Sequence, residues 1–400
     1  MIRIKPFTYN NMYLFLALLA FALPYPSFSL VSQVIILLTL IFLFTNQFKR
    51  KLIYLKNNFK FFLGISVGFF IYVLGALYTT DFHKAINELV LKLPLFIIPL
   101  IFLSEQHPRK LLFYFLKYFS RAVVFFSFLA FLTATYFEIK NIGNYYSYQN
   151  FAIILNKHTT YLALMVSISL IYRFYLLIST PNSMFYELLI IFYHFLILYF
   201  ISNRISFIAL TISFVFLIWT LIKAKFKYFL LLFFPIAFFS IFFLPNFQKR
   251  FQPKTWKKTN MTESFERAKN MSAVWDYTLR NHLFFGLGTG SKRDALYEEY
   301  KHKNLKNAYK HKYNAHNQYL EFFLVNGLFG ATIFIAAQIF LLIVLLKKRD
   351  YFGISLFIIF IIFMMTESIL ERQTGVVLYA IILTLILNQF NKTKFIKSND

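Results

Sequence analysis

Cysteine is absent from this 400-residue chain, and charged residues are scarce, at 14% of the total. The lack of cysteine excludes disulfides, thiolate catalysis and cysteine-ligated metal sites. So few charges could not cover the surface of a soluble domain of this length. Acidic residues are the scarcer kind, since 16 Asp and Glu stand against 42 Lys and Arg. A membrane protein with basic edges fits these absences.

Hydrophobic residues make up 59% of the chain, and they fall in stretches of about 20 residues separated by short charged runs. That length spans the hydrocarbon core of a bilayer as a helix. The sequence therefore predicts an all-α polytopic membrane protein of about twelve transmembrane helices. The expected spans are approximately 11–29, 30–47, 61–78, 90–104, 122–137, 151–172, 184–201, 204–221, 228–244, 317–346, 352–368 and 374–390.

The start of the chain is basic, but no cleavable signal peptide is evident. The apolar stretch after Met1–Lys5 continues past Pro24 without a small-residue cleavage site. We expect the first helix to stay as a membrane anchor.

The formal net charge of +26 could indicate nucleic-acid binding. Cationic loops are, however, expected on the cytoplasmic side of a membrane protein, so no nucleic-acid partner is predicted. With the N-terminus inside, the cytoplasmic loops hold about 21 Lys and Arg and the short outer loops about 6. Among the cations assigned to the inside are Lys49, Lys51, Arg173, Lys347 and Arg349. This bias predicts that both termini face the cytoplasm.

One segment, residues 245–315, is a polar loop between the ninth and tenth expected spans. It carries fifteen Lys or Arg and six Asp or Glu. Long loops translocate regardless of charge, and loops of this length are usually functional. We expect a single membrane domain over 1–400. Its parts are about nine N-terminal helices in 1–244, a loop in 245–315 on the outer side where any chemistry is expected, and about three C-terminal helices in 316–400.

Inside this loop, Ser264–Ala273 and the turns that follow it are expected to form a helix that carries Arg267 and Arg280 near its apolar stripe. A glycine-rich segment comes next, with Gly286, Gly288 and Gly290 at every second position. Glycines at this spacing allow close backbone approach and expose N–H groups suited to anions. A plain turn is the alternative interpretation. No dinucleotide site is expected, because no strand precedes the glycines.

His316 stands where the long loop enters the tenth expected span, at the boundary of membrane and water. Asn317 follows it, and Asn317 and Glu321 share a helix face because they are four residues apart. A neutral imidazole at this place could take a proton from a hydroxyl near pH 7. The alternative is an ordinary interfacial histidine.

Two short outer hairpins hold the other candidates. Arg204 lies between two long apolar spans, where an arginine is costly unless solvated or paired, so it is either functional or snorkels to the interface. Glu367, Glu371 and Arg372 lie in the last hairpin, where they either orient arginines and contact an acceptor or form a local ion-paired turn. No spacing of His, Asp and Glu typical of a metal site is found, and no cofactor is predicted.

Four elements together resemble the O-antigen ligase/polymerase superfamily. They are Asn203-Arg204, Asn281-His282-Leu283-Phe284-Phe285-Gly286-Leu287-Gly288-Thr289-Gly290, His316-Asn317-x-Tyr319-Leu320 with Asn326-Gly327-x-x-Gly330, and Glu367-Ser368-x-x-Glu371-Arg372-Gln373-x-Gly375. The last is similar to a motif of the superfamily's Bacteroidetes-like branch. The elements occur in the family order over roughly residues 200–375, whereas the first 150 residues match mainly in hydropathy.

The resemblance implies a metal-independent glycosyltransferase with a GT-C-like fold. Such an enzyme transfers a glycan from undecaprenyl diphosphate to a hydroxyl of lipid A–core, another glycan or a protein, at the periplasmic face of the inner membrane. His316 would then be the general base, and Arg204, Arg267 and Arg280 would bind the diphosphate, because guanidinium forks match phosphate geometry. A polymerase of the same superfamily and a flippase of lipid-linked oligosaccharide are the alternatives. A transporter would more often place charges in mid-span, and here nearly all lie at span ends.

Overall fold

The structure is a computed structural model, and it describes residues 9–27, 29–44, 48–105, 110–146, 148–180, 183–223, 227–228, 230–232, 236 and 261–390. Every regular element in these ranges is helical, and none of them contains a strand. The expectation of an all-α protein is confirmed for this part of the chain.

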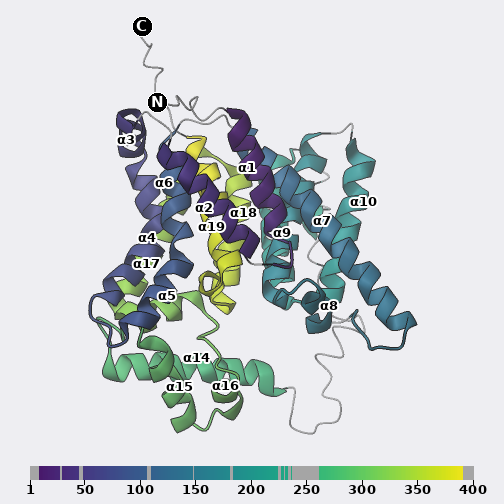
Figure 1. Ribbon diagram of the computed structural model, residues 1–400. Coiled ribbons are helices and arrows are strands. Elements are labelled where there is room, and N and C mark those ends of the chain that lie inside the picture. The colour runs from purple at the N-terminus through teal and green to yellow at the C-terminus, as the bar shows by residue number, and fades with distance from the viewer. Residues whose placement is uncertain are drawn as a thin grey trace.

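The helices form one bundle, with a smaller group of helices at one end (Figure 1). The elements of the first half are α1 (Tyr9–Ala22), α2 (Ser29–Phe44), α3 (Phe48–Asn57), α4 (Phe59–Ala76), α5 (Phe82–Lys92), α6 (Pro94–Leu103), α7 (Lys110–Ile139), α8 (Tyr148–Ile154), α9 (Thr159–Ser179), α10 (Met184–Ile201) and α11 (Arg204–Leu221). The later elements are α14 (Met261–Asn281), α15 (Lys292–His302), α16 (Lys306–Lys310), α17 (Gln318–Lys348), α18 (Tyr351–Thr366), the 3₁₀ turn η2 (Ile369–Glu371) and α19 (Gln373–Asn388).

Seven helices in the described ranges are long and apolar enough to cross a membrane, or eight if the bent pair α2–α3 counts as one span. Two expected spans, 184–201 and 204–221, match α10 and α11 residue for residue. Three other apolar helices, α1, α18 and α19, are shorter than a full span. The 16 residues of α18 extend only about 24 Å, because the chain leaves the helix for the polar turn that carries Glu367. The expected span 228–244 lies largely outside the described residues.

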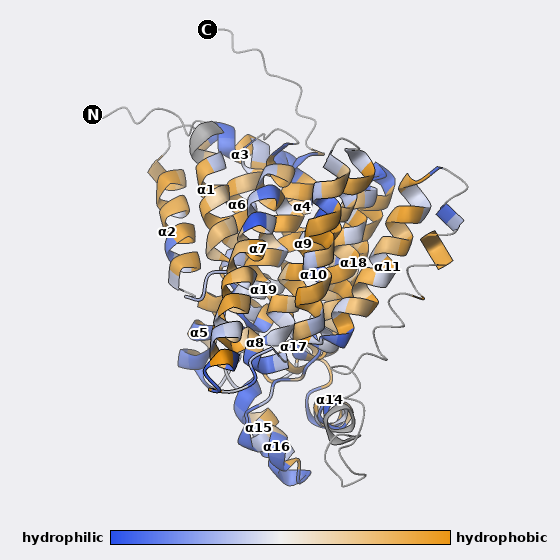
Figure 2. Cartoon of the chain, turned by 90° about the vertical axis from the view of Figure 1, so that its right-hand side faces the viewer, coloured by the Kyte–Doolittle hydropathy of each residue, from blue (hydrophilic) through white to orange (hydrophobic). Residues whose placement is uncertain are grey.

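The two ends of the bundle differ in character. The strongly basic helix α3 lies at the end where α1 begins and α19 ends, and α14, α15 and α16 lie at the opposite end (Figure 1). These three helices and α5 are largely hydrophilic, whereas the bundle between the two ends is hydrophobic (Figure 2). The start of α1 and the end of α19 therefore lie at the same end of the bundle, opposite the long loop, which is the arrangement that the charge pattern predicted.

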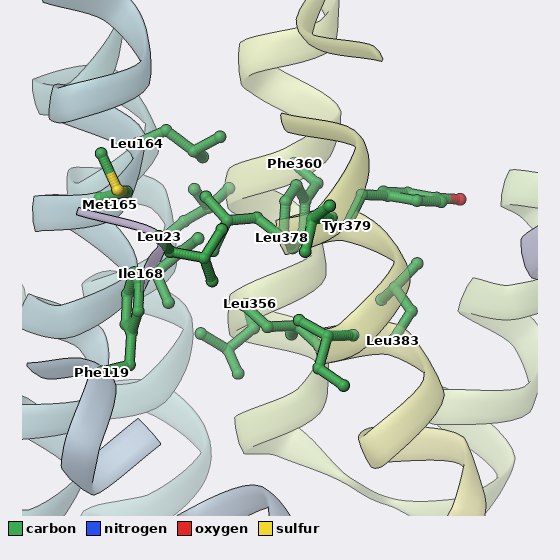
Figure 3. Packing of buried hydrophobic residues seen from close by; sticks show 14 of the residues in the cluster. Leu23, Phe119, Leu164, Met165, Ile168, Leu356, Phe360, Leu378, Tyr379 and Leu383 are labelled. Atoms are coloured by element: carbon green, nitrogen blue, oxygen red, sulfur yellow. The ribbon is translucent and has the colours of Figure 1, made fainter. Parts of the chain in front are cut away.

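The centre of the bundle is formed by α9, α18 and α19. Leu164 and Ile168 of α9 face Leu356 and Phe360 of α18 and Leu378 of α19 (Figure 3), and all five side chains are fully buried. The start of α9 is hydrogen-bonded to the turn between α18 and α19, so the beginnings of α9 and α19 and the end of α18 lie together. These three helix ends carry part of the candidate site.

Arg173 was expected in a cytoplasmic loop, and this assignment is wrong. The residue lies within α9 and is buried, with its guanidinium 3.3 Å from the carboxylate of Glu187 on α10. Its Nε also donates to Ser120 of α7 at 2.7 Å. The apolar sequence around Arg173 does not end the helix there, so the charge is neutralised inside the bundle instead of reaching a loop.

The orientation of the bundle can be tested with cysteines, because the chain has none of its own. Lys310 and Lys348 are exposed at opposite ends. We expect a membrane-impermeant maleimide added to spheroplasts to label Lys310→Cys and to leave Lys348→Cys unlabelled until the membrane is permeabilised. The reverse pattern would place the long loop in the cytoplasm and would contradict the topology.

Candidate active site

Three of the residues singled out by sequence meet at the loop end of the bundle. They are His316, just before α17, Arg267 on α14, and Glu367, just after α18. Nδ1 of His316 lies 3.2 Å from one carboxylate oxygen of Glu367, and the guanidinium of Arg267 lies 3.2 Å from the other. One carboxylate thus joins an imidazole and an arginine from segments far apart in the sequence.

The imidazole of His316 is held by its surroundings. The residue has a left-handed backbone with φ of 49°, which is uncommon for histidine and requires support from neighbouring contacts. Its backbone N–H donates to the side chain of Asn314 at 3.0 Å, and the ring of Tyr313 meets the imidazole edge to face. Of the two ring nitrogens, only Nδ1 has a hydrogen-bond partner among the described residues. Nε2 is therefore the nitrogen that can exchange a proton with a ligand.

Glu367 is buried, with 8% of its side chain exposed, and the hydroxyl of Thr160 at the start of α9 donates to it at 3.3 Å. Burial alone would raise the pKa of this carboxyl. The hydrogen bond to His316 and the charges of His316 and Arg267 outweigh burial and hold the pKa below its usual value. A lowered pKa contributes stability above the ordinary value of about 4.3, and this contribution is lost as the pH falls through the folded-state value. Glu367 is therefore an anion at neutral pH.

Arg204 begins α11 and lies level with this carboxylate. The side chain of Ser213 on α11 donates to the backbone carbonyl of Ser355 on α18 at 3.1 Å. The two helices run antiparallel. Arg204 lies nine residues before Ser213 on α11, or roughly 14 Å along the helix, and this places it beside the end of α18. Glu367 follows within a few residues.

Arg372 is another predicted arginine at this end. It precedes α19, is exposed, and has its guanidinium 5.7 Å from the ring centre of Tyr161 on α9. No ion pair within 4 Å is found for it among the described residues. Arg204 and Arg372 thus lie at helix ends on the same side of the bundle as Glu367, and Arg267 reaches Glu367 from within α14.

The glycine segment does not offer exposed N–H groups to an anion, and this part of the prediction is wrong. The N–H of Gly286 donates to the carbonyl of His282 at 3.0 Å, that of Gly288 to the carbonyl of Val325 at 2.8 Å, and that of Gly290 to the hydroxyl of Thr79 at 2.9 Å. All three donors are used within the protein. The other property expected of the glycines, close backbone approach, is the one the fold uses.

The partner of the glycine segment is a break in α17. Asn326 and Gly327 leave helical geometry, and Gly327 has φ of 61° and ψ of −154°, a conformation essentially restricted to glycine. The N–H of Leu328 beyond the break donates to the carbonyl of Leu283 at 2.7 Å. The glycine segment therefore satisfies backbone groups that the break leaves without helical partners, as is required of irregular backbone near a membrane. The two glycine motifs form one joint.

Glu371 lies in a buried cluster of charges beneath α15 rather than at the surface. Its carboxylate is 2.8 Å from Lys292, 2.8 Å from Arg293 and 3.1 Å from Lys92, and it accepts a hydrogen bond from the hydroxyl of Tyr72. Only 1% of its side chain is exposed. Burial would raise the pKa of Glu371, but the three cations hold it well below the usual range. The geometry favours a role in holding the loop.

Two further carboxylates complete this cluster. Glu88 of α5 lies 3.2 Å from Lys92 and 3.4 Å from Lys292. Glu321 of α17 lies 3.6 Å from Lys292 and 4.0 Å from Arg293. Three cations thus face three carboxylates, so the buried charges balance. We call these six residues the ion cluster: Glu88, Lys92, Lys292, Arg293, Glu321 and Glu371. The sequence offered little signal for Lys292 and Arg293, which resemble the loop's other cations.

Two predicted residues have other roles in this geometry. Arg280 is thirteen residues from Arg267 on α14, roughly 20 Å along the helix, and its nearest carboxylate is Asp276 at 3.9 Å. Asn317 caps α17 by accepting from the N–H groups of Tyr319 and Leu320, and its amide donates to the carbonyl of Met365 at 2.9 Å. Asn317 therefore ties the start of α17 to the end of α18. Among the described residues, no three His, Asp or Glu side chains are grouped to hold a metal ion.

The profile of the O-antigen ligase family matches residues 188–335. This match confirms the resemblance to the O-antigen ligase/polymerase superfamily, and it covers most of α10, all of α11, the loop and about the first half of α17. It indicates a glycosyl-transferring enzyme of the O-antigen ligase/polymerase kind, whose partners in general are a lipid-linked glycan and an acceptor. No curated protein matches the sequence.

The joint between the glycine motifs predicts a sharp effect of a single methyl group. A Cβ at Gly327 would lie 2.4 Å from backbone carbon of Phe284 in a conformation closed to alanine. We expect Gly327→Ala to lower the melting temperature in detergent by on the order of 5 °C or more, because strain and clash add. Gly68→Ala is the control, since its nearest atoms are side-chain ends at 3.3 Å. Equal losses of melting temperature in Gly327→Ala and Gly68→Ala would contradict the close backbone contact between the two glycine motifs.

The ion cluster predicts charge compensation. Glu371→Gln leaves three buried cations facing two carboxylates, and we expect a loss of about 3–5 kcal/mol of stability. Removing a cation as well, in Glu371→Gln/Lys92→Gln, should recover part of this loss, as judged by thermal unfolding in detergent. If the double variant unfolds at a lower temperature than Glu371→Gln, the charges of the cluster do not compensate one another and the prediction is wrong.

Proposed function

We propose that this protein transfers a glycan from undecaprenyl diphosphate to an acceptor hydroxyl at the periplasmic face of a bacterial inner membrane. The observation that carries the proposal is the His316–Glu367–Arg267 contact, with Arg204 and Arg372 on neighbouring helix ends. A base, an orienting carboxylate and several guanidinium groups lie where the apolar bundle meets the polar cap, which is the group of helices α14, α15 and α16. The GT-C-like architecture implied by the resemblance stays a prediction.

His316 is the proposed general base. When Nδ1–H donates to the Glu367 carboxylate, the lone pair of Nε2 is available to the acceptor hydroxyl. The hydroxyl oxygen forms a bond to the anomeric carbon, the bond from that carbon to the diphosphate oxygen breaks, and the diphosphate leaves with the electron pair. The hydroxyl proton goes to Nε2. Glu367 fixes the tautomer and stabilises the imidazolium that forms, as carboxylates do in other catalytic triads.

The diphosphate gains negative charge as it leaves, and guanidinium groups suit it because they form paired hydrogen bonds with phosphate. Arg204, Arg267 and Arg372 are the proposed donors. Arg267 is bound to Glu367 on one side and remains 40% exposed, so it can hold carboxylate and diphosphate together. Arg280 is not included, since its position on α14 puts it roughly 20 Å from Arg267.

An apolar groove supports a lipid-linked donor. A cavity of about 250 Å³ lies between α2 and the α5–α6 pair, lined mainly by Ile35, Ile36, Leu40, Leu93 and Ile97. Gln373 closes it at the loop end, where its amide donates to Ser32 at 2.5 Å. Because Gln373 follows Arg372, the groove ends beside an arginine proposed to bind the diphosphate. We assign the groove to the first prenyl units of the lipid-linked glycan.

Two alternatives share parts of this geometry. A polymerase would use the same base and arginines, and it would differ from a ligase only in its acceptor, which is another lipid-linked glycan. For a ligase the candidate acceptors are lipid A–core, a glycan and a protein. A flippase would need charges along a path through the bundle. The described charges lie mainly at the two ends of the bundle rather than along a path through it, with the Arg173–Glu187 pair as a buried exception, and this favours the enzyme.

The base and the arginine can be tested by substitution. We expect His316→Ala and Arg204→Ala each to lower transfer at least about 100-fold, while membrane insertion stays normal. His302→Ala, an exposed histidine on α15, and Arg280→Ala serve as controls and should transfer normally. Wild-type transfer by His316→Ala or Arg204→Ala would remove the site assignment.

The groove can be tested by filling it. Ile97→Trp places a large side chain in the cavity, and we expect the KM for the lipid-linked donor to rise severalfold with a smaller change in kcat. Ile208→Trp is the control, because Ile208 is 46% exposed on α11 and does not line the cavity. A rise in donor KM for Ile208→Trp alone would contradict the assignment.

Deletion of the gene distinguishes ligase from polymerase. Loss of the polysaccharide ladder on lipid A–core, with accumulation of lipid-linked polymer, is the result expected of a ligase. Single-repeat products indicate the polymerase, and underglycosylated secreted proteins indicate a protein acceptor. An unchanged set of surface glycans and glycoproteins would contradict transfer altogether.

A further inference from the structure

Glu321 is a fully buried carboxylate at the start of α17, a member of the ion cluster that also bonds to the residue before the proposed base. We propose that it is a positioning residue, one that sets the geometry of His316 and Glu367 without touching either substrate. The inference rests on the proposed function, since His316 and Glu367 are the groups it would position. With 0% of its side chain exposed, Glu321 has no surface on which to bind a ligand.

One oxygen of Glu321 contacts both segments that carry the proposed catalytic pair. Oε1 accepts from the backbone N–H of Ala315 at 2.8 Å and from the hydroxyl of Ser368 at 3.4 Å. Ala315 directly precedes His316, and Ser368 directly follows Glu367. A single atom therefore links the residue before His316 to the residue after Glu367.

The segment before α17 needs such an anchor. His316 has positive φ, as does Lys312 four residues earlier, so this stretch would relax to commoner conformations if its contacts were removed. Tyr297 and Tyr300 of α15 donate to the carbonyls of Lys312 and Asn314 at 3.2 and 3.3 Å. These hydroxyls hold the segment from the loop side, and Glu321 holds it from the bundle side.

The second oxygen of Glu321 makes only charge interactions. Oε2 lies 3.6 Å from Lys292 and has no hydrogen-bond partner among the described residues. An amide nitrogen at this place would remove no hydrogen bond, whereas a shorter side chain would withdraw Oε1 from Ala315. Shape and charge can therefore be separated by substitution at this residue.

Glu88 offers the matched control. Its carboxylate faces the three cations of the ion cluster, but no hydrogen bond or ion pair joins it to Ala315, His316, Glu367 or Ser368 among the described residues. A residue that only balances charge would behave like Glu88. A residue that also positions the base would not.

The test compares shape with charge in the full-length protein, purified in detergent and supplied with lipid-linked glycan and acceptor. Glu321→Asp keeps the charge and loses the reach, and we expect kcat to fall more than about tenfold with the donor KM within about threefold, since small misplacements of catalytic groups are costly. Glu321→Gln keeps the length of the side chain and, although the lost charge lowers stability, should retain kcat within about threefold at temperatures well below its melting temperature. Under the same conditions Glu88→Asp and Glu88→Gln should both keep kcat within about threefold of the unaltered protein. Equal kcat for both Glu321 variants, or equal losses at Glu88, would overturn the proposal.

A distance measurement decides the same point without activity. Spin labels at Lys312→Cys and Met365→Cys, both exposed, report the separation of the His316 segment from the end of α18. We expect a narrow distribution that broadens in Glu321→Asp and stays narrow in Glu88→Asp. An unchanged distribution in Glu321→Asp would overturn the positioning role. Absence of transfer by the unaltered protein would instead refute the proposed function, and this distribution would still decide whether Glu321 is an anchor.

Discussion

The buried contact between three cations and three carboxylates is the interaction on which the rest of this structure depends. Lys292 and Arg293 enter from the polar loop, and the carboxylates that receive them come from α5, α17 and η2. Each charge would be costly alone in this apolar setting, so the loss of any one partner lowers the stability of the fold. The ion cluster therefore seats a basic, hydrophilic cap in one position on a hydrophobic bundle.

The position of the cap determines the position of the proposed chemistry. Arg267 reaches Glu367 only because α14 lies across the loop end of the bundle, and the left-handed segment at His316 is supported from both sides. The paired glycine motifs add a second attachment, in which loop backbone bonds to the break in α17. Two independent attachments, one ionic and one made by backbone, give the rigid support that a preorganised site requires.

The sequence located most of the candidate site but did not assign all of its roles. His316, Arg204 and Arg267 were found from residue type and membrane depth, together with the motifs of the superfamily. Glu367 and Glu371 looked alike, as neighbouring acids of one hairpin. Only the fold separates them, because the turn η2 directs one toward the base and buries the other under α15. The glycines were assigned to anion binding because backbone pairing across distant segments is not visible in a sequence.

Hydropathy and charge by themselves determined the class of protein, the ends of α10 and α11, and the side of the bundle on which the loop lies. These properties follow from the length of apolar stretches and from the scarcity of charge, which are local quantities. The tertiary structure alone decided which carboxylate meets which cation, that Arg173 is buried, and that α17 breaks at Gly327. Such pairings depend on the free energy of bringing distant buried groups together, and no local pattern records it.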